Sequence, residues 1–468
     1  MRAKEISILI ACVILGLILL CLVFPRDGVN LGFTELRFPS LIEALQGDTT
    51  TYVDPEEQMA RLEQEQQALQ HAREDSSFIA KINQSSAKIW FPGDDVTYFD
   101  AVFKALEGAS KQHVRIIHYG DSQLELDRIS SDLREMLQAK FGGRGKGWIP
   151  VVPMAGNYTV ATYCSPQLRQ GVQYSIGDET RPRDRKGGPY ATAAYLDGGS
   201  VNITVRGADE EKYPHIHGFS RIKVVAGSNG SELTVSCKGN TVKMPATTGL
   251  DIATIDVDST SEARITISGH AHLYGVLVDS PTGVTVDNVP MRGCSGTIFS
   301  GMSKQELTDF FARERVPLIL LQYGGNMVPG VSTKNLESVI NSLRSQLDFF
   351  KEIAPNTRIM FIGPSDMSTK RGGGMHTYKN LPMFNDALRT MCLEAGVAYW
   401  DMFAVMGGED SMASWVKSGY AGSDYVHFSR KGAERISGIL NNTLSLYYDY
   451  YTFRNKQNKP TPNAQEHK

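Results

Sequence analysis

The segment Val114-Arg115-Ile116-Ile117-His118-Tyr119-Gly120-Asp121-Ser122 is the most informative part of the chain for its class of fold. It is an apolar strand that breaks at glycine, and a helix-like segment, residues 123–141, begins directly behind it. In a parallel sheet such a turn leaves the serine hydroxyl in the crevice outside the strand ends, beside the N–H groups of a helix terminus. Serine is also an ordinary helix N-cap residue, so this turn alone does not separate a nucleophile from a cap.

Two later segments carry the groups that a serine nucleophile needs. Asn326 follows the apolar run 316–322, and Asp424 and His427 stand just before the helix-like stretch 430–447. Acyl transfer requires a hydroxyl, an imidazole within about 3 Å, a carboxylate that holds the imidazole tautomer, and donors aimed at the developing oxyanion. We therefore expect Ser122, His427 and Asp424 to act together, with the Asn326 amide as a donor.

In the order and setting of these motifs the chain resembles the SGNH/GDSL hydrolase superfamily, whose four blocks contribute Ser, Gly, Asn and His. The glycine block falls on Gly293, which follows the strand-like residues 283–289, with Gly296 as the competing choice. The resemblance covers about residues 96–150 and 285–450. It implies that Ser122 is the nucleophile, that His427 is the base oriented by Asp424, and that the oxyanion donors are Ser122 and Gly293 through their backbone N–H groups and Asn326.

The spacing of strands and helices predicts an α/β fold with a flavodoxin-like, doubly wound parallel sheet. Strand-like residues 316–322, 357–362 and 397–402 alternate with helix-like residues 303–314, 333–352 and 383–395. Between them and the first strand, residues 151–284 show period-two alternation with turn signals, which is typical of a β-sandwich or jelly roll. Such a domain resembles carbohydrate-binding modules.

The pattern divides the chain into six parts. They are a cytoplasmic tip and transmembrane anchor (1–27), a polar helical linker acting as a spacer (28–95), the first part of the hydrolase domain (96–150), the inserted β-domain (151–284), the second part of the hydrolase domain (285–453) and a disordered tail (454–468).

The N-terminus predicts attachment to a membrane. Residues 6–24 are 19 apolar residues without charge, about the length that crosses a bilayer, and Arg2 and Lys4 precede them. By the positive-inside rule the basic tip stays in the cytoplasm, and the catalytic domain lies in the periplasm or outside the cell. A cleaved signal peptide is the alternative, but no small-residue cleavage site follows the run.

Other patterns narrow the binding partners. The net charge of -3 gives no basic surplus for nucleic acid. The pairs His215/His217 and His270/His272 lack matching ligands, so we expect neither metal nor cofactor. The glycine-rich residues 142–147 follow a helix and lack a Ser or Thr after the lysine, which excludes a Walker motif and favours a flexible rim loop.

We further expect some of these side chains to contact substrate. Arg144 or Lys146 in that loop is placed to touch an anionic substrate, and His376, in the glycine loop 372–376, to border it. Trp148, Tyr158, Tyr163 and Tyr190 fit either sugar stacking or a core. A disulfide among the cysteines outside the membrane segment cannot be assigned.

The resemblance implies a carbohydrate O-acetylesterase similar to bacterial peptidoglycan O-acetylesterases. Its substrate is an acetylated extracytoplasmic glycan. A polysaccharide O-acetyltransferase that uses the same acyl-enzyme, and a non-catalytic glycan-binding envelope protein, stay open as alternatives. The sequence leaves the oligomeric state undetermined.

Overall fold

The computed structural model describes residues 3–24, 29–30, 35–36, 54–73, 77–174, 187–207 and 209–457. Its central sheet has six strands, in the order β14 (Gly283–Pro290), β4 (His113–Gly120), β15 (Leu318–Gln322), β16 (Arg358–Ile362), β19 (Ala398–Trp400) and β3 (Ile89–Trp90). The first five are parallel, and β3 pairs antiparallel at the edge. In chain order the parallel strands run 2-1-3-4-5, so the predicted flavodoxin-like sheet is confirmed.

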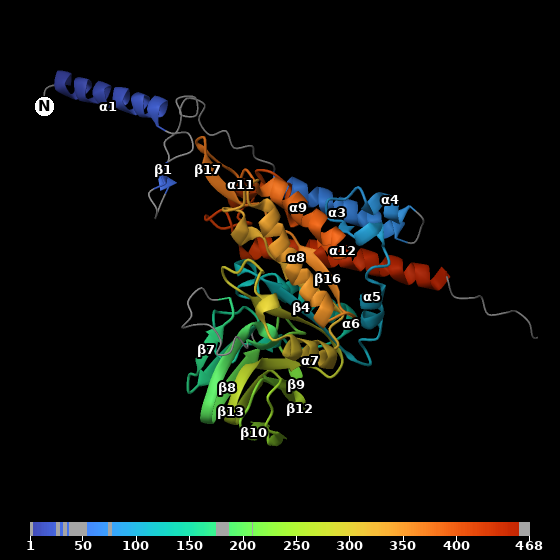
Figure 1. Ribbon diagram of the computed structural model, residues 1–468. Helices are drawn as coiled ribbons and strands as arrows, with labels where there is room; N and C mark the ends of the chain where they lie inside the picture. Colours follow the sequence, from blue (N-terminus) through green and yellow to red (C-terminus); the bar gives the residue numbers. More distant parts are fainter. Residues whose placement is uncertain are drawn as a thin grey trace, which may run out of the picture.

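Helices cover both faces of this sheet, as Figure 1 shows. Alternate residues of each buried strand face opposite layers, so that Ile116 packs in one core cluster and Ile117 in the other. The layer on the Ile116 side contains α3 (Pro55–Ala72), α4 (Phe78–Ile82), α5 (Asp100–Glu107), α6 (Ser130–Phe141), α10 (Met402–Met406), α11 (Ser411–Lys417) and α12 (Arg430–Gln457). The layer on the Ile117 side contains α7 (Lys304–Glu314), α8 (Leu336–Ile353) and α9 (Leu381–Glu394).

An antiparallel β-domain lies between β4 and β14 in the sequence. Its strands are β5 (Gly147–Ile149), β6 (Val160–Ser165), β7 (Arg169–Val172), β8 (Thr192–Gly207), β9 (Phe219–Ala226), β10 (Leu233–Cys237), β11 (Asn240–Met244), β12 (Asp251–Thr260) and β13 (Glu262–Asp279). The first half of β13 pairs with β8 and β10, and its second half pairs with β9 and β5. The long strand β13 thus passes from one layer to the other, and the predicted inserted sandwich is confirmed (Figure 1).

The glycine-rich loop before β5 is a tightly packed joint, so the expectation of a flexible rim loop is wrong. A Cβ at Gly145 would lie 2.3 Å from the carbonyl oxygen of Val278, and one at Gly147 would lie 2.1 Å from a carboxylate oxygen of Asp287. Both glycines have positive φ, at +85° and +77°. Glycine is needed here because the loop backbone lies directly against the end of β13 and against β14.

A buried ion cluster joins the insert to the parallel sheet. Arg115, in the middle of β4, is fully buried and donates two hydrogen bonds to Asp287 of β14, at 2.8 and 3.0 Å. It also binds Glu314 of α7 at 3.0 Å and Asp279, the last residue of β13. Although burial opposes it, the surrounding cations hold the pKa of Asp279 below its usual range. Arg115 therefore fixes the exit of the insert against the strand that leads to Ser122.

The polar segment expected as a spacer instead packs on the hydrolase domain. The apolar side of α3 is buried, with Met59, Leu62 and Leu69 at most 3% exposed in the core cluster that contains α12. Gln66 of α3 donates to the carbonyl oxygen of Ile439 at 3.3 Å. The spacer prediction is wrong because the apolar stripe of this helix, although narrow, meets a complementary face of α12. Residues 37–53 of the predicted linker lie outside the described residues.

Two helix boundaries also differ from the expectation. Ser122 begins one 3₁₀ turn, Ser122–Leu124, and α6 begins only at Ser130. Leu126 and Asp127 adopt left-handed backbone angles, φ 62° and 65°, which stop a continuous helix. At the other end, α12 continues to Gln457, past the start of the predicted tail at residue 454, and residues 458–468 lie outside the described residues.

The N-terminal helix α1 (Ala3–Val23) is long and apolar enough to cross a membrane. Its segment Lys4–Val23 has a mean hydropathy of 3.3, and it is the one helix among the described residues with this length and composition. A signal sequence has the same properties. Two short antiparallel pairs complete the described elements, β1 (Val29–Asn30) with β2 (Glu35–Leu36) and β17 (Ser368–Arg371) with β18 (Gly374–Thr377).

We predict that Arg115→Met lowers the free energy of unfolding by about 3–5 kcal/mol, because it leaves buried carboxylates without their shared cation. Chemical denaturation of the purified protein measures the loss. The matched control is Arg206→Met, which removes an exposed pair with Glu262 between β8 and β13 and should change stability little. Equal effects of the two substitutions would contradict a special role for the buried cluster.

Candidate active site

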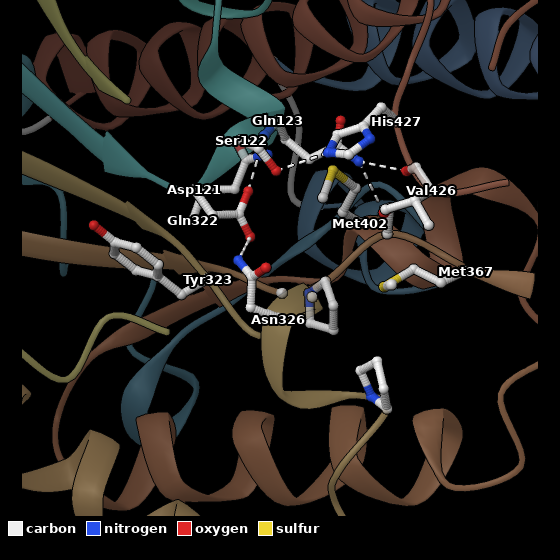
Figure 2. A pocket seen from close by; sticks show the side chains of 15 residues that line it. Asp121, Ser122, Gln123, Gln322, Tyr323, Asn326, Met367, Met402, Val426 and His427 are labelled. Carbon is white, nitrogen blue, oxygen red and sulfur yellow. Dashed lines mark hydrogen bonds between the residues drawn. The ribbon is translucent and has the colours of Figure 1, made fainter. Parts of the chain in front are cut away.

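A cavity of about 160 Å³ opens at the carboxyl edge of the parallel sheet. Its walls come from the segments that follow four strands: Asp121 to Gln123 after β4, Tyr323 to Asn326 after β15, residues 363–365 after β16, and Met402 after β19. Val426 and His427, from the loop before α12, complete it (Figure 2). The site lies where the strand order reverses, between β4 and β15, which is the usual ligand position in doubly wound sheets.

Three predicted residues form a continuous hydrogen-bonded chain at this cavity. The Ser122 hydroxyl lies 2.7 Å from Nε2 of His427, and Figure 2 shows the two side chains facing each other. Nδ1 of His427 lies 2.8 Å from Oδ2 of Asp424. The two partners occupy opposite ring nitrogens, so one tautomer donates to Asp424 and accepts from Ser122.

The carboxylate of Asp424 also organises the loop that carries the imidazole. Its Oδ1 accepts the backbone N–H groups of Val426 and His427, each at 3.0 Å. Against the opposing effect of partial burial, hydrogen bonds from the backbone and ring of His427 lower the pKa of Asp424. Asp424 is therefore ionised at neutral pH and holds both the loop and the ring.

Asn326 lies across the cavity from His427, with its amide close to the turn of Ser122. Its Nδ2 donates to the carbonyl oxygen of Cys294 at 3.0 Å and, over a longer 3.3 Å, to Oδ2 of Asp121 (Figure 2). Gly293 follows β14 in the neighbouring loop, where the Met291 N–H donates to the carbonyl oxygen of Gly120 at 2.8 Å. The loop of Gly293 thus contacts both the end of β4, just before Ser122, and the side chain of Asn326.

The two glycines of that loop differ in their surroundings. Gly293 is exposed, with φ +73° and space for a Cβ, whereas a Cβ at Gly296 would collide with the ring of Tyr323 at 2.7 Å. Gly296 is needed for close packing beneath Tyr323. Packing does not require a glycine at position 293. Gly293 therefore stays the preferred oxyanion donor, as the sequence predicts.

Asp121 supports the turn of the serine. Its Oδ1 accepts the Gln123 N–H at 2.9 Å, and its side chain is 5% exposed. Burial raises the pKa of Asp121 to about 6. The charged form of Asp121 is therefore less favoured in the folded protein than it is in water.

No sequence pattern points to Gln123 as a functional residue. It is buried next to Ser122, and its side chain holds the His427 loop from both sides: Nε2 donates to the Val426 carbonyl at 2.6 Å, and Oε1 accepts the Phe428 N–H at 3.2 Å. These contacts span more than 300 positions of the sequence, so only the folded chain reveals them. Gln123 fixes the base relative to its covalent neighbour, the serine.

The two expected substrate-binding residues lie outside this cavity. Arg144 is exposed near Gly218, and its backbone N–H donates to Ser280 at 3.0 Å. His376, on β18, is 9% exposed with Nδ1 3.3 Å from Asp410. Neither lines the Ser122 cavity.

The expected aromatic cluster is divided between core and surface. Trp148 and Tyr190 are buried and stack with ring centroids 4.7 Å apart, whereas Tyr163 is 61% exposed. Tyr158 is half-buried beneath the guanidinium of Arg430. The four rings therefore do not form one sugar-stacking surface.

A doubly wound sheet with a Ser-His-Asp chain at its switch point is an arrangement that suits a hydrolase with a serine nucleophile. Residues 258–435 match the family model of the GDSL-like lipases and acylhydrolases. The match begins within β12 and contains Asn326, Asp424 and His427, while Ser122 precedes the insert. Over residues 258–435 the chain is similar to that family, and this similarity supports an esterase.

Solved structures share the fold. A peptidoglycan O-acetylesterase is 19% identical with a TM-score of 0.62, and the match covers 76% of this chain and 98% of that one. Family two carbohydrate esterases from Cellvibrio japonicus and Clostridium thermocellum are 11% and 10% identical, with TM-scores of 0.26 and 0.25. Those matches cover 62% and 60% of this chain and 98% and 100% of theirs, and at such TM-scores they carry no argument. No curated protein sequence matches the chain.

We predict that Asp121→Asn flattens the pH dependence of stability. Because the folded-state pKa is raised, Asp121 binds more protons in the folded protein than in the unfolded chain between about pH 4 and 6, and this one group lowers stability by roughly 3 kcal/mol over that window as the pH rises. Asp132 and Asp366, whose pKa values burial also raises to about 6, titrate in both proteins, so the Asn variant should lose roughly 3 kcal/mol less than the wild type. Denaturant unfolding at pH 4, 5, 6 and 7 measures the difference between the two slopes.

The change in the free energy of unfolding with pH is the quantity to compare. The Asn side chain places an N–H donor opposite either the Gln123 N–H or the Asn326 amide, and this lowers stability by the same amount at every pH. Parallel wild-type and variant curves from pH 4 to 7 would show that Asp121 titrates normally in the folded protein.

We predict that Gln123→Met lowers kcat for a small acetyl ester by about 10- to 100-fold with little change in KM, because the His427 loop loses both of the hydrogen bonds that tie it to the residue after Ser122. The control is Gln346→Met on α8, which removes a buried amide that binds Ser300 far from the cavity. Gln346→Met should lower stability and leave kcat near the wild-type value. A drop in kcat common to both variants would point to general loosening instead of positioning.

Proposed function

We propose that this protein is a serine esterase that removes O-acyl groups, acetyl in the first place, from an extracytoplasmic polysaccharide such as peptidoglycan. The observation that carries the proposal is the 2.7 Å contact between the Ser122 hydroxyl and Nε2 of His427 in an open cavity, with Asp424 behind the ring. A serine that served only as a helix cap would need no imidazole at that distance.

In the first half of the reaction, Ser122 attacks the ester carbonyl while His427 takes the hydroxyl proton at Nε2. The ionised Asp424 stabilises the imidazolium that forms, and the proton then passes to the departing sugar oxygen. The product of this step is an acyl-serine and a free glycan hydroxyl. Water, activated by the same imidazole, attacks the acyl-serine and releases the carboxylic acid.

The negative charge that develops on the carbonyl oxygen requires donors already in place. In our proposal these donors are the backbone N–H groups of Ser122 and Gly293 and the amide of Asn326. The Asn326 amide holds the Cys294 carbonyl at 3.0 Å and Asp121 at 3.3 Å. The longer contact is the weaker one, and it is the contact that an oxyanion would replace.

The likeness in fold to a peptidoglycan O-acetylesterase, over 98% of that chain, supports a glycan substrate. The β-sandwich inserted between β4 and β14 supports a polymer larger than a simple lipid ester, since residues 153–157 of the insert and Glu125, three positions after Ser122, line one cavity. The apolar helix α1, preceded by Arg2, supports an anchor in the cytoplasmic membrane with the esterase domain on its outer side.

We predict that Ser122→Ala reduces the release of acetate from p-nitrophenyl acetate and from O-acetylated peptidoglycan by about 10⁴-fold or more. It should also abolish labelling by a fluorophosphonate. The labelling control is Ser365→Ala, which removes another serine hydroxyl that lines the cavity and should leave the protein labelled.

Two other outcomes would replace the proposal. Acetyl groups that appear on an added glycan faster than in free acetate would make the protein an acetyltransferase. Unchanged ester cleavage in Ser122→Ala, with glycan binding retained, would make it a binding protein of the same fold.

A further inference from the structure

A second cavity, of about 220 Å³, lies between the hydrolase domain and the insert. The hydrolase side contributes Glu125 and Arg292, and the insert side contributes Asn157 and Tyr174. The cavity is next to the first one because residues 122–127 form part of both walls, with Ser122 in the first and Glu125 in the second. A ligand long enough to fill both cavities would cross this short segment.

Lys146 lines the second cavity as a deeply buried cation. Its side chain is 3% exposed, and Nζ lies 3.4 Å from Oδ2 of Asp127. Within the described part of the chain, Asp127 is the one hydrogen-bond or ion-pair partner of this ammonium group. An ammonium has three N–H donors, so a single long contact leaves most of its capacity unused.

Asp127 is already committed to another cation. It accepts two hydrogen bonds from the buried Arg134, at 2.8 and 3.1 Å, and a third from the Thr159 hydroxyl at 2.7 Å. One carboxylate therefore faces two buried cations. Burial lowers the pKa of Lys146 to about 8, as expected for an ammonium whose charge is poorly compensated.

The other charged groups of the cavity do not balance this excess. Glu125 is paired with Arg292 at 2.7 Å at the mouth. A second buried carboxylate that acts on Lys146, Asp287, accepts two hydrogen bonds from Nη1 of Arg115. The cavity thus has a buried, poorly compensated positive charge in its wall, and an opposite charge is favoured there.

We propose that the second cavity binds a carboxylate carried by the glycan substrate, with Lys146 as its counter-ion. The inference rests on the proposed function, since it describes the sugar whose ester group reaches Ser122. One excess positive charge matches a singly charged carboxylate better than a phosphate dianion. A neutral sugar at this place would leave the Lys146 charge buried without an added partner.

The test compares two substrates that differ in one group. They are O-acetylated N-acetylmuramic acid, with its free lactyl carboxylate, and the same sugar with a lactyl carboxamide. Wild-type protein should deacetylate the acid with the higher kcat/KM, and Lys146→Met should lower that value by about 10- to 100-fold, the usual range for one charge-assisted hydrogen bond. In the variant the acid and the amide should have similar kcat/KM values.

The matched control is Arg144→Met, which removes an exposed cation two residues away that lines neither cavity. It should leave the preference for the acid unchanged. The circular dichroism spectrum and the thermal unfolding of Lys146→Met, compared with those of the wild type, show whether the variant folds. A wild-type protein that cleaves p-nitrophenyl acetate but treats acid and amide alike would overturn this inference alone, whereas inactivity towards every ester would overturn the proposed function.

A measurement on wild-type protein covers the case in which Lys146→Met fails to fold. The deacetylated acid should inhibit p-nitrophenyl acetate hydrolysis at concentrations about 10-fold lower than its carboxamide. Equal inhibition by the two sugars would show that the cavity does not recognise the carboxylate.

Discussion

The buried guanidinium of Arg115 is the constraint on which the arrangement of the two domains depends. It lies in the strand that ends at Ser122, and it binds carboxylates from β14, α7 and the last residue of the insert. The chain also enters the insert at this point, because the Trp148 N–H donates to Asp287, the same carboxylate that Arg115 holds. Both crossings between the domains are therefore fixed to one strand of the parallel sheet.

This arrangement explains why the site could be located from the sequence before its contacts were known. Ser122 and Asn326 each follow a strand, and the carboxyl ends of neighbouring parallel strands meet at one edge whatever the length of the chain between them. The insert of more than 130 residues after β4 does not alter this rule, since β14 returns to the side of β4 in register. The sheet and the meeting of Ser122 with Asn326 follow from local patterns beside strand ends. His427 precedes α12, and its approach to Ser122 was expected from the chemistry of a serine nucleophile and from the resemblance to the family.

The parts that the sequence did not predict depend on contacts between distant residues. Gln123 looks like any polar residue after a serine until its amide meets Val426 and Phe428. Lys146 lies in a glycine-rich loop that resembles a mobile connector, and only the backbone of β13 and β14 shows why the loop is closed in. The late start of α6 arises from Asp127, which has a left-handed backbone and accepts a hydrogen bond from Arg134. Helix propensities do not predict either feature.

The packing of α3 on α12 has a consequence for the synthesis of the chain. Arg73, just after α3, pairs with Asp449 of α12, 376 positions later. As the polypeptide leaves the ribosome, the apolar stripe of α3 has no lasting cover until nearly the whole chain has been made. A chaperone or holding factor would have most to shield at this early segment, and a translation product that stops before α12 would present that stripe to proteases.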